Sequence, residues 1–279
     1  MRLRSTWSLA VCSLFALVAA CGDDDGGGDS SDHPDAAANI DASSVVDATA
    51  GEPDAMPADI SCLGNPAPTD APATVTLTGS VFSIGIGGNS PVEGAIVQMR
   101  RAANDRNLDS NAPDGTPADG SFALTGKTRG TALEAYLRST ADALVTTRVY
   151  PPLPIFLDLP MVPVPMFDPI IVSFLSPDQE ADKGIVLILV LDCAGQPVQG
   201  ATAMSTPEAG GIIYTDDMGM PDQSATSTSA SGIAILVNVP AGTVTVNATA
   251  MGEALLAHDV ASVPDEVTST AVLPGAPVL

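Results

Sequence analysis

Short stretches in which apolar and polar residues alternate dominate the chain from residue 73 to residue 273. Valine, isoleucine, leucine and threonine fill these stretches, and clusters of glycine, asparagine, aspartate and proline separate them. Alternation places every second side chain on one face, as expected of half-buried strands in a β-sandwich. The predicted strands cover residues 73–82, 95–101, 121–125, 132–139 and 144–150 in a first series, and 184–191, 201–205, 212–215, 232–239, 243–250 and 267–273 in a second.

The segment between the two series is rich in proline, which cannot donate to a sheet ladder. We therefore expect residues 151–165 to form an edge strand or a surface connection, because prolines stand at positions 151, 152, 154, 160, 163 and 165. Asp168 and Pro169 follow and precede an apolar run. An N-cap aspartate before a proline at the first helical position predicts a short helix there.

The two series share landmarks that indicate a tandem repeat. The sequence PVEGA at residues 91–95 matches PVQGA at 197–201, and GSFAL at 120–124 matches GIAIL at 232–236. A repeated supersecondary unit is the simplest account of such matches. The Pro-Ala-Gly sequence at residues 240–242 further predicts a tight hairpin between two strands of the second unit.

The sequence VLDCAGQPVQGA at residues 190–201, together with Gly232 and NVPAGTV at residues 238–244, resembles the carboxypeptidase regulatory-like domain, a small transthyretin-like β-sandwich. The resemblance covers residues 184–250 well and residues 75–124 less well, because the loop at residues 102–118 is long and polar. It implies Greek-key sandwiches that serve exported proteins as accessory, adhesive or stalk modules, and it implies no catalytic residue. The expected fold is all-β, with sandwiches over residues 61–165 and 184–279 and a connector carrying the helix at 166–183.

The N-terminus has the organisation of a bacterial lipoprotein signal peptide over residues 1–20. Arg2 and Arg4 precede an apolar segment at residues 9–18, and two alanines stand before Cys21. Cys21 is then expected to carry a diacylglycerol that anchors the chain to a membrane, with the outer membrane favoured, in the periplasm or on the cell surface. Residues 21–60 are predicted to be a disordered acidic linker, because residues 22–60 hold ten aspartates and no lysine or arginine.

The net charge of the chain limits the kinds of partner that it can bind. The chain has 33 acidic and 10 basic residues and a formal net charge of -23, so its potential repels nucleic acid and anionic headgroups. Aromatic residues make up only 4% of the chain, which predicts small cores.

Of the four cysteines, Cys12 leaves with the signal peptide and Cys21 takes the lipid, which leaves Cys62 and Cys193. An exported, oxidising setting favours a disulfide between them over two separate buried thiols. In the chain-entropy model, a loop of this length is worth about 4 to 5 kcal/mol.

Residues suited to catalysis or metal binding are scarce. The only histidines are His33, in the linker, and His258, which we expect at the surface, so no zinc site or Ser-His-Asp triad can be assembled. Asp105, Asn107, Asp109 and Asn111 alternate in the long loop and form a weak candidate for calcium. The alternative, which we favour, is that these residues cap turns, because Ser110 and Thr116 stand where an EF-hand needs glycine and glutamate.

These observations favour a non-enzymatic protein without a cofactor, for which two functions remain open. The first is a lipid-anchored surface module whose long loops, at residues 102–118 and 207–229, bind a glycan or a protein. The alternative is a structural component of the periplasm that acts as a spacer or as an assembly partner of other envelope proteins.

Overall fold

The computed structural model describes residues 58–86 and 88–277, which are nearly all β-structure. The predicted all-β sandwich fold is confirmed, and every predicted strand is present. The strands before the helix are β1 (Thr74–Gly85), β2 (Gly88–Pro91), β3 (Ile96–Arg101), β4 (Asn107–Ser110), β5 (Ser121–Lys127), β6 (Ala135–Thr140), β7 (Thr147–Tyr150) and β8 (Leu159–Phe167). After α1 (Pro169–Leu175) come β9 (Lys183–Val190), β10 (Thr202–Thr206), β11 (Gly211–Thr215), β12 (Pro221–Asp222), β13 (Ile233–Pro240), β14 (Gly242–Ala250), β15 (Glu253–Ala254), β16 (His258–Ser262) and β17 (Val267–Val272).

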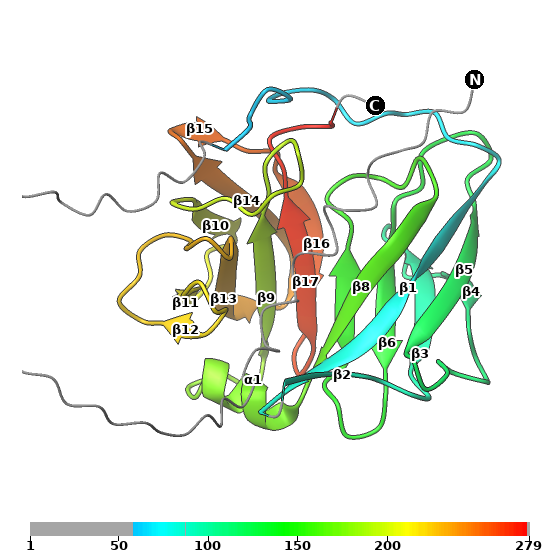
Figure 1. Cartoon of the computed structure of the whole chain (residues 1–279), viewed down its shortest axis with the longest axis horizontal. Coiled ribbons are helices and arrows are strands. Elements are labelled where there is room, and N and C mark those ends of the chain that lie inside the picture. Colours follow the sequence, from blue (N-terminus) through cyan, green and yellow to red (C-terminus); the bar gives the residue numbers. More distant parts are fainter. Residues whose placement is uncertain (1–57, 87, 278–279) are drawn as a thin grey trace, which may run out of the picture. The chain divides into compact units, whose positions relative to one another are not determined.

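One sheet of nine strands runs through both strand series, in the order β12-β11-β13-β9-β17-β7-β6-β3-β4. Its centre is β17, the last strand of the chain, which pairs in parallel with β9 on one side and with β7 on the other (Figure 1). A smaller sheet of β2, β1, β5 and β8 and another of β10, β14, β15 and β16 complete the architecture. The two series are therefore joined through continuous strand pairing as well as through the connector.

The two smaller sheets pack on opposite faces of the nine-stranded sheet. Tyr150 of β7 belongs to the core formed with β14, whereas its neighbour Val149 packs against the core formed with β1, β5 and β8. Successive side chains on a strand point to opposite faces, so the two cores lie on opposite sides of the sheet. Strand β9 is buried on both faces, because α1 and Phe167 cover the side that faces away from β14.

The strand pairings show the tandem repeat directly. We call residues 74–167 the first repeat and residues 183–272 the second. In each repeat, a long strand pairs antiparallel with one partner and parallel with another: β1 with β5 and β8, and β9 with β13 and β17. The remaining correspondences are β3 with β10, β6 with β14, and β7 with β16.

The proline-rich segment and the short helix also form as predicted. Strand β8 pairs only with β1 among the described strands, so it is an edge strand of its sheet. Asp168 caps α1 by accepting a hydrogen bond from the Ile170 amide at 2.8 Å, and proline occupies the first turn. The prediction of a hairpin at the Pro-Ala-Gly sequence is wrong, because Ala241 joins β13 to β14 but the two strands belong to different sheets and do not pair.

A strap of residues 58–73, drawn in blue and cyan in Figure 1, lies against both repeats before the chain enters β1. At its start, the Cys193 amide donates to the Asp59 carbonyl at 2.7 Å, and the Asn65 carbonyl accepts from the Ala276 amide at 3.0 Å. At its end, the Ala132 amide of the first repeat donates to the Thr69 carbonyl at 2.7 Å. The strap therefore connects the two repeats by a route separate from the central sheet.

Candidate functional site

The predicted cysteine pair is confirmed, because Cys62 and Cys193 form a disulfide with a Cα separation of 5.7 Å. Cys62 lies on the strap and Cys193 follows β9, so the cross-link fixes the strap to the second repeat. Asp192 supports this contact, since its carboxylate accepts hydrogen bonds from the amides of Asp59 at 3.1 Å and Ala194 at 2.9 Å. Cys21 lies outside the described residues, and its lipidation stays a prediction.

The four residues considered for calcium are engaged separately by protein groups. Asp109 accepts a hydrogen bond from the Thr125 amide at 2.6 Å, and Asn111 accepts from the Val97 amide at 2.8 Å. Asp105 is paired with an arginine, as described below, and Asn107 begins β4. Within residues 58–86 and 88–277, no group of three or more His, Cys, Asp or Glu side chains is placed to hold a metal ion. Asp109 and Asn111 thus bond to residues 14 to 16 positions away and do not cap turns of the loop itself.

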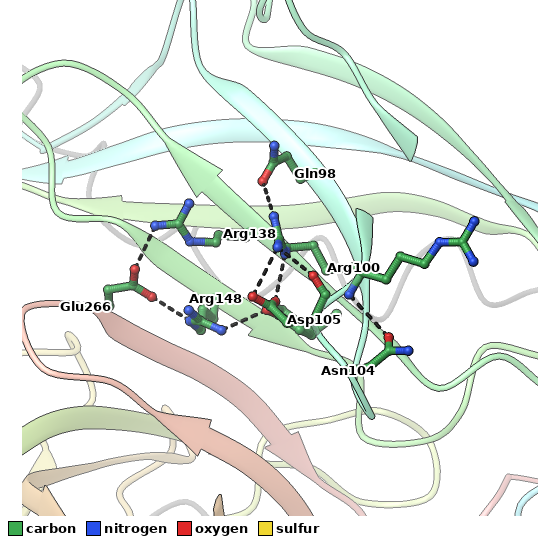
Figure 2. Close-up of polar contacts among 9 residues, drawn as sticks. Gln98, Arg100, Asn104, Asp105, Arg138, Arg148 and Glu266 are labelled. Atoms are coloured by element: carbon green, nitrogen blue, oxygen red, sulfur yellow. Dashed lines mark hydrogen bonds and ion pairs between the residues drawn. The ribbon is translucent and has the colours of Figure 1, made fainter. Parts of the chain in front are cut away.

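A cluster of charged and aromatic side chains covers part of the nine-stranded sheet where the two repeats meet (Figure 2). We call this set the junction cluster. Strands β3, β6 and β7 position most of it, because Arg100, Tyr136 and Arg148 alternate with buried core residues and so share the face opposite the first core. Its members are Gln98, Arg100, Asp105, Tyr136, Arg138, Arg148 and Glu266.

Glu266 binds two arginines of the first repeat from the turn that joins β16 to β17. One carboxylate oxygen pairs with Arg138 Nη2 at 2.8 Å, and the other pairs with Arg148 Nε. The side chains of Arg148 and Glu266 are each only 12% exposed, so this pair is largely shielded from solvent. Glu266 of the second repeat therefore contacts both β6 and β7 of the first repeat through ion pairs.

Tyr136 connects this ion pair to the other end of the cluster. Its hydroxyl donates to Asp105 and accepts from Arg148 Nη1 at 2.8 Å, while the Arg148 guanidinium lies 5.3 Å from the ring centroid. The ring stacks on Tyr150 with centroids 4.6 Å apart. Arg100 completes the chain with an ion pair from Nε to Asp105 Oδ1 at 2.7 Å. Each charged group thus faces an opposite charge or a hydroxyl.

These contacts shift the pKa values of Tyr136 and Asp105 away from their ordinary values. Burial, together with the hydrogen bond to Asp105, raises the pKa of the Tyr136 hydroxyl well above its usual range. Burial also acts to raise the pKa of Asp105, but hydrogen bonds from Arg100 and Tyr136 outweigh it and lower that pKa. The arrangement favours a fixed structural contact between the repeats, with a neutral tyrosine between charged partners.

His258 is not the surface residue that the sequence suggested. Its Nε2 lies 2.7 Å from Thr270 Oγ1, and Thr270 Oγ1 also lies 3.0 Å from the Tyr150 carbonyl. Which of the two atoms donates in the contact between Nε2 and Thr270 Oγ1 depends on the imidazole tautomer, and Nδ1 is a buried atom. Burial lowers the pKa of His258, against smaller opposing effects of a hydrogen bond to the Leu256 backbone and of the charge on Asp259.

The two long loops differ in the apolar surface that they expose. In the loop at residues 102–118, Thr116 is buried and Asn111 is bonded to β3. The predicted loop at residues 207–229 contains β11 and β12, and in the turn between them the side chains of Met218 and Met220 are 65% and 53% exposed. The second loop therefore offers the more apolar exposed surface. In the described part of the chain, no helix is long and apolar enough to cross a membrane.

The junction cluster was not anticipated from the sequence, although one signal pointed to it. Tyr136 and Arg138 alternate in one predicted strand, and Arg148 and Tyr150 alternate in the next. Charged residues in register on neighbouring strands indicate a polar face. The partner carboxylate could not be found in this way, because Glu266 is 118 residues from Arg148.

Comparison with known proteins gives no family. No family model and no curated protein matches the chain. Among solved structures, the shaft pilin SpaA of Lactobacillus rhamnosus GG is similar at 11% identity over 74% of this chain and 100% of the pilin, with a TM-score of 0.24. The minor pilin GBS52 of Streptococcus agalactiae is similar at 12% identity over 74% of this chain and 98% of the pilin, with a TM-score of 0.24. The TIE protein of Bacillus anthracis is similar at 13% identity over 71% of this chain and 33% of that protein, with a TM-score of 0.23. Scores of this size do not establish a shared fold or function.

Proposed function

We propose that the protein is a non-catalytic binding or adhesion module of the bacterial cell envelope, held at a membrane by a lipid on Cys21. The linker would carry the two sandwiches away from that membrane, and a glycan or an envelope protein would be bound there. The observation that carries this proposal is the covalent attachment of the strap where the chain emerges from the linker.

The position of the disulfide suits a tethered module. Cys62 is only four residues beyond the first described residue, Ala58, and it is bonded to the second repeat. Tension along the linker would therefore reach Cys193 through a covalent bond before it could peel the strap from the repeats. Without the cross-link, the same tension would fall on backbone hydrogen bonds, each worth about 1 kcal/mol.

The charged residues of the junction cluster also suit a protein that acts by binding a partner at its surface and not by acid-base catalysis. In the junction cluster, Arg138 and Arg148 pair with Glu266 of the other repeat, and Tyr136 is bonded to Arg148 within the first repeat. Loop 207–229 is the surface we assign to the partner, because Met218 and Met220 project from it. Loops that carry recognition on a rigid sandwich are a common arrangement.

Protease shaving of intact cells tests the location. A fragment that begins near residue 58 should be released by an external protease, while a known periplasmic protein stays intact as the control for leakage. Protection of the fragment until the cells are lysed would support the periplasmic spacer or assembly partner instead. Substitution M218S/M220S should weaken binding to cell-envelope material without lowering the unfolding midpoint, because both side chains are exposed.

A further inference from the structure

Strand β10 forms an open edge of its sheet, because among the described strands it pairs only with β14. A groove of about 560 Å³ lies where the chain passes from β10 to β11. Met204, Ser205, Glu208, Gly211 and Ile212 are among the residues that line it. Met204 is 44% exposed and Ile212 is 38% exposed, so the groove is accessible to a partner.

The free backbone groups of this edge belong to Ser205. On the side away from β14, the Ala201 carbonyl accepts from the Thr228 amide at 2.9 Å. On the same side, the Ala203 amide donates to the Tyr214 hydroxyl at 3.2 Å. Backbone groups of successive residues point to opposite sides of a strand, so Ser205 also directs its N–H and C=O groups away from β14, where no described strand pairs with it. Its hydroxyl oxygen is buried and has no hydrogen-bond partner among the described residues.

The first repeat shows what covers such an edge. Strand β3 is the counterpart of β10, and Met99 takes the place of Ser205, since each stands four residues after the alanine of the matched PVEGA and PVQGA sequences. Met99 pairs with Asp109 of β4, which runs antiparallel to β3. In the second repeat, the segment that follows β10 forms β11 and pairs with β13 of the nine-stranded sheet. The β10 edge therefore lacks the neighbouring strand that β3 has.

The charge around the groove determines which occupant fits. Glu208 lines the groove, and residues 184–279 contain nine aspartates and glutamates but no lysine or arginine. A second copy of this chain, or its own acidic segment at residues 22–60, would bring further negative charge to this edge. A segment that carries lysine or arginine would bring the complementary charge.

We propose that β10 binds an extended, basic peptide segment of a partner protein by strand addition, with Ser205 at the centre of the new pairing. The added strand takes the place beside β10 that β4 has beside β3. Its main chain bonds to the N–H and C=O groups of Ser205, and its basic side chains lie near Glu208. This inference rests on the proposed binding function and assigns it a protein partner in place of a glycan.

Selection from a library of short random peptides tests the proposal, with the chain from residue 22 onward, purified without lipid, as the target. We expect the selected peptides to be rich in β-branched residues and in lysine or arginine. A bound peptide should slow hydrogen exchange at the Ser205 amide. Added salt should weaken the binding, because opposite charges contribute to it.

Four variants separate the backbone contact from the charge. S205P removes the outward N–H group at an edge position that tolerates proline, and it should weaken peptide binding about tenfold. S205A is the matched control, because it keeps the N–H group and should retain most of the binding. E208K should weaken the basic peptides, whereas E253K, the same charge change on β15 beyond β14, should have a smaller effect.

Selection of no peptide would overturn the proposal, and so would peptides that bind S205P as tightly as the unchanged chain. If S205P does not fold, methylation of alternate peptide amides replaces it, because a methylated amide cannot donate to the Ser205 carbonyl. Unchanged affinity after methylation of either alternate set would equally overturn the proposal. Protection from protease on intact cells would contradict the surface module but leave these binding results unaffected, so the two proposals fail separately.

Discussion

Thr116 and Thr228 make the same four hydrogen bonds in the two repeats. In each case, the threonine backbone pairs with an alanine and a glycine, while its buried hydroxyl accepts from the alanine amide at 2.9 Å and donates to a valine carbonyl. The partners are Ala95, Gly94 and Val92 in the first repeat and Ala201, Gly200 and Val198 in the second. In each repeat, one threonine hydroxyl thus stabilises the turn before the equivalent strand, which is β3 in the first repeat and β10 in the second.

Substitution T116V should lower the free energy of unfolding by about 1 to 3 kcal/mol, because it leaves the buried Ala95 amide without an acceptor. T228V should have a similar effect through Ala201. Urea unfolding followed by circular dichroism measures the change. T116S keeps the hydroxyl and is the matched control; a loss in T116S equal to that in T116V would show that the methyl group, and not the hydrogen bonds, matters.

Substitution E266Q should destabilise the contact between the repeats by about 2 to 4 kcal/mol, because it leaves Arg148 as a shielded charge without its carboxylate. The comparison is R138Q, at a side chain that is 29% exposed, for which we expect less than about 1 kcal/mol. Both changes are read from the urea midpoint. Equal effects of the two substitutions would contradict the view that the shielded Arg148–Glu266 pair matters more than the Arg138–Glu266 pair.

Stability should fall as the pH drops below about 6.5, the ordinary pKa of histidine, because burial lowers the pKa of His258 in the folded protein. Between the folded pKa and 6.5, the unfolded chain binds more protons at this residue, so acid favours unfolding in that range. Aspartates with a lowered pKa, such as Asp105, destabilise the folded protein only when the pH falls below the ordinary aspartate pKa of 3.8. H258Q should flatten the decline just below pH 6.5; an unchanged slope would refute the role of His258.

Removal of the disulfide in C62S/C193S should cost about 4 to 5 kcal/mol, since the cross-link closes a loop with a sequence separation of 131. Hydrogen exchange should rise first in the strap, residues 58–73, because its start would then be held only by backbone hydrogen bonds. A uniform rise over both repeats would indicate that the bond acts on the whole fold and not through the strap. The single variant C62S gives the same test with one thiol left.

The strands could be predicted because their signal is local. Alternation of apolar and polar residues marks β5 and β14, and the proline spacing marks β8 as an edge. The Thr116 and Thr228 contacts also had a signal, since each threonine stands four residues before a matched glycine, Gly120 or Gly232.

No local sequence pattern indicates that β17 lies at the centre of the nine-stranded sheet. Its parallel pairing with β7 joins Val267 to Thr147, 120 residues earlier in the chain, and no turn between neighbouring strands fixes that register. The burial of His258 depends on the same strand, through Thr270. Long-range contacts of this kind follow from packing between the repeats, which local periodicity does not encode.

Mass spectrometry of the mature N-terminus tests the anchored module most directly. Peptides from the membrane fraction of the native bacterium should begin at Cys21 and carry the mass of a diacylglycerol on its thiol, and C21S should remain unprocessed and unlipidated. A mature chain that begins elsewhere, or that begins at Cys21 with an unmodified thiol in the soluble fraction, would contradict the proposed anchor and the function built on it.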